Sequence, residues 1–126
     1  MNFPDNLKYT RDHEWISLNG KIGTIGVTDY AQGELGDVVF VDIDPNKKEI
    51  KAGESIGTIE AVKTVSDIFA PCSGKVVEIN SGLQSTPEVV NSDPYGTGWM
   101  VKIELSNLSE LDALLDSNAY KELIGK

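Results

Sequence analysis

Lys63 is the side chain best placed for covalent chemistry, because it stands between two segments whose residues favour β-strands. Segments 54–59 and 64–70 are rich in β-branched residues, and Pro71, which cannot donate to a sheet, ends the second. A lysine at the bend between two strands holds its amine away from the sheet, where an enzyme can reach it. Most exposed lysines are only solvated charges, however, and ten of the eleven basic residues here are lysines.

Other reactive residue types are scarce. His13 is the only histidine and has no second histidine or cysteine beside it, so we expect no metal site. Cys72 is the only cysteine, so no intramolecular disulfide can form, and it lacks the neighbours that activate a thiol. We therefore expect Cys72 to be structural. The sequence shows no set of acid, base and nucleophile, which predicts a protein that is not an enzyme.

The segments around Lys63 predict a mainly β chain. A hairpin is predicted over 13–25, where Asn19-Gly20 is typical of a type I′ turn. A short helix is predicted near 29–35, with Asp29 and Gln32 as a capping box and Leu35-Gly36 as its stop. Thr86-Pro87 fits the start of a helical turn. Further strands are predicted over 37–43 and 75–80.

The end of the chain changes from strand to helix periodicity. Segment 99–105 alternates, and segment 107–124 carries apolar residues at helical spacing. We expect the C-terminal helices to cap one end of the sheet structure. In the strand, one predicted core face consists of Trp99, Val101, Ile103 and Leu105, opposite Met100, Lys102 and Glu104. In the helices, the predicted stripes consist of Leu108, Leu111, Leu114 and Leu115, then Ala119, Tyr120, Leu123 and Ile124.

Length and composition fit one domain over 1–126, with a core over 9–105. The formal net charge of −9 argues against nucleic acid and anionic membranes as partners. No stretch approaches about 18 consecutive apolar residues, and the segment before residue 15 has no apolar region and little positive charge, so we expect neither a membrane span nor a signal peptide. We expect a monomer in the bacterial cytoplasm, or in the mitochondrial matrix if this is the mature chain of a eukaryote.

Two short motifs occur twice. Ile22-Gly23-Thr24-Ile25 recurs as Ile56-Gly57-Thr58-Ile59, and Gly36-Asp37-Val38-Val39 is echoed by Gly74-Lys75-Val76-Val77. Two similar halves favour a sandwich of two β-sheets related by a quasi-twofold axis.

Many segments between residues 9 and 104 match, in order, the pattern of one family. They are Tyr9 with His13-Glu14-Trp15, Thr24-Ile25-Gly26-Val27-Thr28-Asp29, Ala31-Gln32, Leu35-Gly36-Asp37-Val38-Val39-Phe40-Val41, Glu60-Ala61-Val62-Lys63, Ser66-Asp67, Pro71 with Ser73-Gly74, Val89-Val90-Asn91, Pro94-Tyr95 and Gly98-Trp99-Met100. Over about three quarters of its length the chain thus resembles the H proteins of the glycine cleavage system.

The resemblance implies a barrel-sandwich hybrid, the fold of lipoyl and biotinyl carriers, with lipoic acid joined by an amide to Lys63. It implies that Glu60 and Asp67 either guide the lipoate ligase or lipoyl/octanoyl transferase, or surround the lipoyl arm. It further implies three partner enzymes: a pyridoxal phosphate-dependent glycine decarboxylase, a tetrahydrofolate-dependent aminomethyltransferase and a flavin-dependent dihydrolipoyl dehydrogenase. The carrier would move the aminomethyl group of glycine from the first to the second, and the third would reoxidise it.

The resemblance also implies a surface cleft that shelters the loaded arm. Glu14 and Asp67 match that cleft, with Asp12 and Glu34 nearby, and their carboxylates suit a cationic amine. Some relatives have serine at the position of Asp12 and histidine at that of Glu34, and we expect the added carboxylates of this chain still to attract a cation.

Three other interpretations are weighed against the glycine cleavage carrier. Biotinyl carriers commonly have methionine on both sides of the lysine, and lipoyl domains of 2-oxo acid dehydrogenases commonly have Asp-Lys-Ala. Val62 and Thr64 fit neither. A relay that donates its lipoyl group to the domains of other enzymes is the remaining alternative, and the sequence alone does not separate it from the glycine cleavage role.

Overall fold

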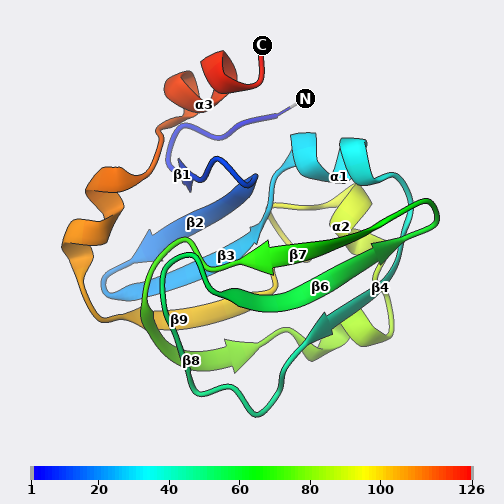
Figure 1. Ribbon diagram of the computed structural model, residues 1–126, viewed down its shortest axis with the longest axis horizontal. Coiled ribbons are helices and arrows are strands. Elements are labelled where there is room, and N and C mark those ends of the chain that lie inside the picture. Colours follow the sequence, from blue (N-terminus) through cyan, green and yellow to red (C-terminus); the bar gives the residue numbers. More distant parts are fainter. Residues whose placement is uncertain (1, 126) are drawn as a thin grey trace.

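The computed structural model describes residues 2–125 as two antiparallel β-sheets with short helices around them (Figure 1). The larger sheet has six strands, in the order β1 (Lys8–Tyr9), β2 (Glu14–Asn19), β3 (Ile22–Val27), β9 (Val101–Leu105), β8 (Gly74–Ile79) and β5 (Glu49–Ile50). The smaller sheet has three, β4 (Val38–Ile43), β6 (Ser55–Ala61) and β7 (Val65–Phe69). The helices are α1 (Asp29–Leu35), α2 (Val89–Ser92) and α3 (Ser117–Leu123), with 3-10 turns η1 (Ser81–Gln84) and η2 (Leu108–Ala113). This confirms the predicted fold class of a mainly β chain with two antiparallel sheets.

The main core lies between the two sheets. In Figure 1, β6 and β7 cross in front of β2, β3 and β9. Side chains alternate along each strand, so that Val41 and Ile43 of β4 are buried while Phe40 and Asp42 are exposed. The same alternation in the other strands brings Ile16, Ile25, Ile59, Ile68 and Ile103 into one apolar cluster.

A second apolar cluster lies on the other face of β1 and β2. Trp15 belongs to it, whereas its neighbour Ile16 points into the main core, so β2 is covered on both faces. Tyr120 of α3 stacks on Tyr9 with ring centroids 4.8 Å apart and meets the edge of Phe3 at 5.5 Å. The C-terminal helix α3 therefore covers this face of the larger sheet. The prediction was that the C-terminal helices cap one end of the sheet structure.

The predicted hairpin over 13–25 is confirmed, but its turn differs from the prediction. Asn19 pairs with Ile22, so the two turn residues are Gly20 and Lys21. Among the described non-glycine residues only His13 has a positive φ angle, and Gly20 has φ 64°. A type I′ turn needs positive φ at both positions, so glycine at the first position alone fits a type II′ turn.

The N-cap predicted for the first helix was wrong by one residue. Thr28, not Asp29, caps α1, and its hydroxyl accepts a hydrogen bond from Ala31 N at 3.1 Å. Asp29 and Gln32 do interact, but through their side chains, at 2.7 Å. The predicted stop is confirmed, because Gly36 ends the helix and donates its N–H to Gln32 O.

Several burial predictions near the C-terminus were wrong. Met100 is fully buried in the main core, whereas Trp99 packs only partly, against the second cluster, because regular strand geometry begins at Val101. Leu108 and Leu123 are exposed, and residues 108–113 form a 3-10 turn instead of an α-helix. Three further elements, β1, β5 and η1, had no predicted counterpart.

The repeated motifs occupy one strand of each sheet. Ile22–Ile25 lies in β3 and Ile56–Ile59 in β6, while the second motif begins β4 and β8. The two motif-bearing strands are neighbours in the smaller sheet, but β9 separates them in the larger one. The motifs are thus shared between the sheets, although strand order alone does not define a twofold axis.

Candidate functional site

Lys63 lies in the bend between β6 and β7. This bend is at the margin of the molecule (Figure 1), and the start of β4 pairs with the end of β6 beside it. Ala61 N donates to Thr64 O at 2.8 Å across the bend, and Val62 N donates to Asp37 O at 3.0 Å. The backbone on both sides of Lys63 is therefore fixed, while its side chain is exposed and forms no ion pair among the residues that the structure describes.

Gly36 forms the surface on which the Lys63 side chain rests. A Cβ atom built on Gly36 would lie 3.1 Å from Lys63 Cε and 3.7 Å from its Nζ. Gly36 also has φ 81° and ψ −157°, a conformation that residues with a side chain avoid. Glycine at this position both ends α1 and leaves room for the lysine.

Asn91 of α2 holds the connection between α1 and β4 in place. Its Oδ1 accepts from Val38 N at 2.8 Å, and its Nδ2 donates to Gly36 O at 2.8 Å and to Gln32 Oε1 at 3.0 Å. These bonds grip the chain on both sides of Asp37, whose carbonyl receives the amide of Val62. Asn91 thus acts on the Lys63 bend through one intervening residue.

The two acidic residues predicted to flank the lysine are exposed on the smaller sheet. Glu60 is opposite Phe40 on one side and Val65 on the other. Asp67 is opposite Thr58, and its Oδ1 lies 3.5 Å from the Ser55 hydroxyl. Both carboxylates are therefore on the solvent-facing side of strands that lead to Lys63.

Glu14 is a buried carboxyl group at the far end of β7. It is only 2 % exposed, accepts from the Thr10 hydroxyl at 2.6 Å and accepts from Phe69 N at 3.3 Å. Burial raises the pKa of Glu14 to about 7, and these hydrogen bonds oppose the rise. Phe69 is six residues beyond Lys63, about 20 Å along an extended strand, and Asp67 lies between them.

The four predicted cleft carboxylates do not form one cluster. Glu14 and Asp12 line the same cavity of about 260 Å³, together with Thr10, Arg11 and residues 113–115. Glu34 and Asp67 are exposed and do not line it. The structure thus brings Asp12 to Glu14 and leaves the other two on the surface.

His13 is held between the cleft and the C-terminal helix. Its Nδ1 lies 2.8 Å from the Tyr120 hydroxyl, which also lies 2.8 Å from the Thr28 hydroxyl. Burial lowers the pKa of His13, and the negative charges of Asp12 and Glu34 act in the opposite direction. The residue lies just before β2, in a positive-φ conformation of 71°.

Cys72 has the character of a structural residue. It is completely buried in the main core. Burial, with a smaller effect from the negative charge of Glu110, raises the pKa of its thiol to about 11. No group of three possible metal ligands was found within residues 2–125.

Sequence patterns did not reveal the roles of Gly36 and Asn91. Gly36 appeared as a helix stop, in a repeated motif and in the family pattern, and Asn91 only in the family pattern; none of these signals shows their contacts, which join segments more than 20 residues apart. No local signal could have found these contacts, since they depend on how α1, α2 and the β6–β7 hairpin pack together.

The sequence model of the family described as "Glycine cleavage H-protein" matches residues 7–126. This chain belongs to the glycine cleavage H-protein family. The chain is 54% identical over 124 residues to the glycine cleavage system H protein of Bacteroides fragilis, with 98% of each chain covered. It is 56% identical over 119 residues to that of Symbiobacterium thermophilum, covering 94% of this chain and 93% of the relative.

A solved structure supports the same assignment. The crystal structure of a glycine cleavage system H protein from Mycobacterium marinum superposes with a TM-score of 0.89 at 37% identity, covering 98% of this chain and all of that one. The expected barrel-sandwich fold of the lipoyl carriers is thereby confirmed.

H proteins carry covalently attached lipoate and serve as the lipoyl carrier of the glycine cleavage system. Membership of this family implies interaction with the decarboxylase, the aminomethyltransferase and the dihydrolipoyl dehydrogenase. The residues present suit such a cofactor, because an exposed lysine without an ion pair among the described residues stands on a fixed bend. Within residues 2–125, no helix has the length and apolar character needed to span a membrane.

Proposed function

We propose that lipoate is joined to Lys63, and that the chain acts as a carrier without a catalytic site of its own. The observation that carries this proposal is the position of Lys63, exposed on a bend whose backbone is held by hydrogen bonds from the Ala61 and Val62 amides before it and to the Thr64 carbonyl after it. A tethered group on a rigid bend reaches docked enzymes at a high effective concentration. When bound, lipoate supplies the thiol chemistry, which the buried Cys72 does not.

The attachment is an acyl transfer to nitrogen. The lipoate carboxyl carbon, activated as an acyl adenylate or as a protein-bound thioester, is attacked by the unprotonated Lys63 amine. The new C–N bond forms as the bond to the activating group breaks, and the nitrogen releases one proton. A lipoate ligase or a lipoyl/octanoyl transferase is the enzyme class that this step requires.

Mass spectrometry tests the attachment site. After incubation with lipoate, ATP and lipoate ligase, we expect one lipoyl amide in the intact mass and its location on Lys63 in the peptide map. Lys63→Arg should stay unmodified and should lose all support of glycine–bicarbonate exchange by the decarboxylase. Lys75→Arg, an exposed lysine on β8, is the matched control and should behave as wild type. Modification at another lysine would contradict the proposal.

We propose that Glu60 and Asp67 contribute to recognition by the attaching enzyme or to the surroundings of the arm. We also propose that the cavity beside Glu14 and Asp12 receives the amine of the loaded arm, with Asp67 along its path and Glu34 near His13. The support is that Asp67 lies along β7 between Lys63 and Phe69, whose N–H donates to the buried Glu14 carboxylate of β2. Glu14→Gln should shorten the lifetime of the aminomethyl-loaded protein, measured by mass, more than Glu34→Gln does.

We further propose that residues 1–126 function as one lipoyl-carrier domain, as a monomer in the bacterial cytoplasm. Light scattering after gel filtration should give the mass of a single chain, 13.7 kDa. A mass of two chains would contradict the monomer.

A further inference from the structure

Four exposed apolar side chains gather around the Lys63 bend. Val62 is 75% exposed, Val65 62%, Val39 52% and Phe40 42%. We call these four residues the hairpin surface. None of them belongs to either apolar cluster of the described chain, so they contribute little to the core.

The strand register places these residues side by side. Phe40 of β4, Glu60 of β6 and Val65 of β7 form one row across the outer face of the smaller sheet. Val62 precedes Lys63 in the bend, and Val39 lies at the irregularity between Val38 and Phe40. The apolar side chains thus lie next to Lys63 both in the bend and on the strands that lead to it.

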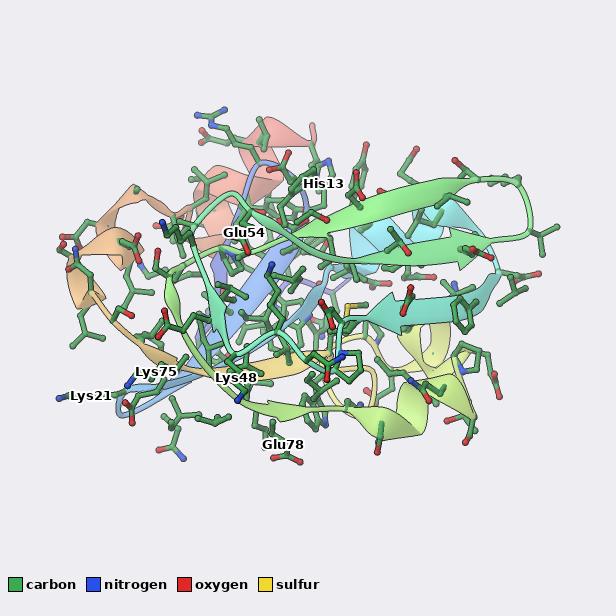
Figure 2. The ribbon with its side chains drawn as sticks, turned by 60° about the horizontal axis from the view of Figure 1, so that its bottom comes forward. His13, Lys21, Lys48, Glu54, Lys75 and Glu78 are labelled. Carbon is green, nitrogen blue, oxygen red and sulfur yellow. The ribbon has the colours of Figure 1, made fainter. Side chains whose placement is uncertain are left out.

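The charges around the hairpin surface are nearly all of one sign. Residues 34–43 and 55–69 contain a single basic residue, Lys63, whose charge is lost on acylation, whereas their acidic residues are Glu34, Asp37, Asp42, Glu60 and Asp67. Lys21, Lys48 and Lys75 lie at the opposite end of the molecule (Figure 2). The strand register confirms that these three lysines lie near one another. Glu104 of β9 pairs with Lys75 on one side and with Ile22, the neighbour of Lys21, on the other. Lys75 also pairs with Glu49, the neighbour of Lys48.

We propose that the hairpin surface is the docking site for the enzyme that acylates Lys63, an inference that rests on the proposed attachment site. The partner presents an apolar strip beside its acyl-transfer site, with lysine and arginine residues around it. The strip covers the hairpin surface, and the basic rim faces the five acidic residues. Exposed apolar residues grouped in this way mark interaction sites rather than ordinary surface.

The reach of the lysine side chain selects this partner over the others. Nζ lies about 6 Å from its own Cα even when the side chain is extended, so an enzyme that acylates it must touch the neighbouring residues. The decarboxylase, the aminomethyltransferase and the dehydrogenase act at the far end of the lipoyl arm. Those three enzymes have no such need to cover the bend.

The test compares substitutions of exposed apolar residues by threonine on the two sheets. Val65→Thr and Phe40→Thr keep β-branched or smaller side chains at exposed positions, and Val77→Thr, at a valine of β8 that is 53% exposed, is the control. With purified lipoate ligase, lipoate and ATP, kcat/KM for attachment should fall at least threefold in each hairpin variant and at least tenfold in the double variant. The loss should appear mainly in KM, and Val77→Thr should stay within twofold of wild type.

A second measurement separates this docking site from the others. Each variant is lipoylated to completion and assayed for glycine–bicarbonate exchange, which should remain within twofold of wild type. Wild-type attachment rates in both hairpin variants would overturn the proposal. An equal loss of attachment and exchange would also overturn it, because the surface would then serve the decarboxylase. If the wild-type protein is not modified at Lys63, the attachment proposal fails, and this one with it.

Discussion

The side chain of Lys63 lies across Gly36, so closely that a methyl group on Gly36 would come within 3.1 Å of Lys63 Cε. Gly36 lies between α1 and β4, and Lys63 lies between β6 and β7, so the two residues are in different connections of the smaller sheet. Their contact joins the end of a helix to the modification site proposed here, and it can be changed without touching the lysine.

Gly36→Ala should both destabilise the protein and slow the acylation of Lys63. Alanine in this backbone conformation costs about 2 kcal/mol, and its methyl group displaces the lysine side chain. Gly53→Ala is the control, because Gly53 has φ 83° but no atom within 4 Å of an added Cβ. Urea unfolding should show a loss in both variants, whereas kcat/KM for lipoylation should fall only in Gly36→Ala. Equal lipoylation rates would separate Gly36 from the site.

Asn91→Ala should loosen the Lys63 bend. The substitution leaves Gly36 O and Val38 N without partners, which costs about 2 kcal/mol. Hydrogen exchange of the Val62 amide, bonded to Asp37 O, should become at least tenfold faster.

Asn80→Ala provides the control for that change. Asn80 also makes three hydrogen bonds, to Thr97 O, Trp99 O and Gly82 N, but on the other sheet. Its loss should lower stability without a selective effect on Val62. If exchange at Val62 rises equally in both variants, Asn91 contributes only to global stability.

The buried Glu14 predicts a specific dependence of stability on pH. Its pKa is raised from 4.5 to about 7 in the folded state, so the folded protein retains this proton when the unfolded chain has lost it. The contribution is therefore fully present below pH 4.5 and is lost as the pH rises towards and through 7. The shift corresponds to at most about 3 kcal/mol.

Glu14→Gln removes this titration. We expect the free energy of unfolding of wild type, minus that of Glu14→Gln, to fall by up to about 3 kcal/mol between pH 4.5 and 8. Urea unfolding at several pH values measures both. A constant difference would mean that Glu14 ionises in the fold as it does in the unfolded chain.

Cys72 should resist alkylation in the native protein. Burial raises the pKa of the thiol to about 11, so little thiolate is present at pH 8, and the side chain is inaccessible. Iodoacetamide should react at least about 100-fold more slowly than in urea, where the thiol has an ordinary pKa. Rapid labelling of the folded chain would show that the core opens at Pro71 to Ser73.

Local patterns predicted most of the strands and the place of Lys63. Alternation in β4 and β9, the glycine after Asn19 and the glycine after Leu35 are all signals carried by neighbouring residues, and they were sufficient for the hairpin and for α1. The errors at Asp29 and Asn19 were errors of one residue: the adjacent Thr28 caps the helix, and the turn is shifted by one position to Gly20 and Lys21.

Contacts between distant segments could not be predicted in this way. Met100 is buried because Met100 N bonds to Ile25 O before regular pairing begins, and Leu108 is exposed because its segment winds as a 3-10 turn. Asp67 and Glu14 are 53 residues apart in sequence, and their distance depends on how β7 passes β2. Periodicity describes which face of an element is apolar, but not which other element covers it.

Acidic residues surround Lys63 almost without basic ones, whereas at the other end Lys21, Lys48 and Lys75 are interspersed with Glu49, Glu78 and Glu104, so the negative charge is distributed unevenly over the molecule (Figure 2). An asymmetric charge distribution experiences a torque in the field of a charged enzyme, and so rotates during approach. The Debye length is about 8 Å at physiological ionic strength, so this rotation begins only when the two surfaces are nearly in contact. The carrier would then present its lysine to a basic active-site entrance during the last few ångströms of the encounter, and added salt would randomise its orientation.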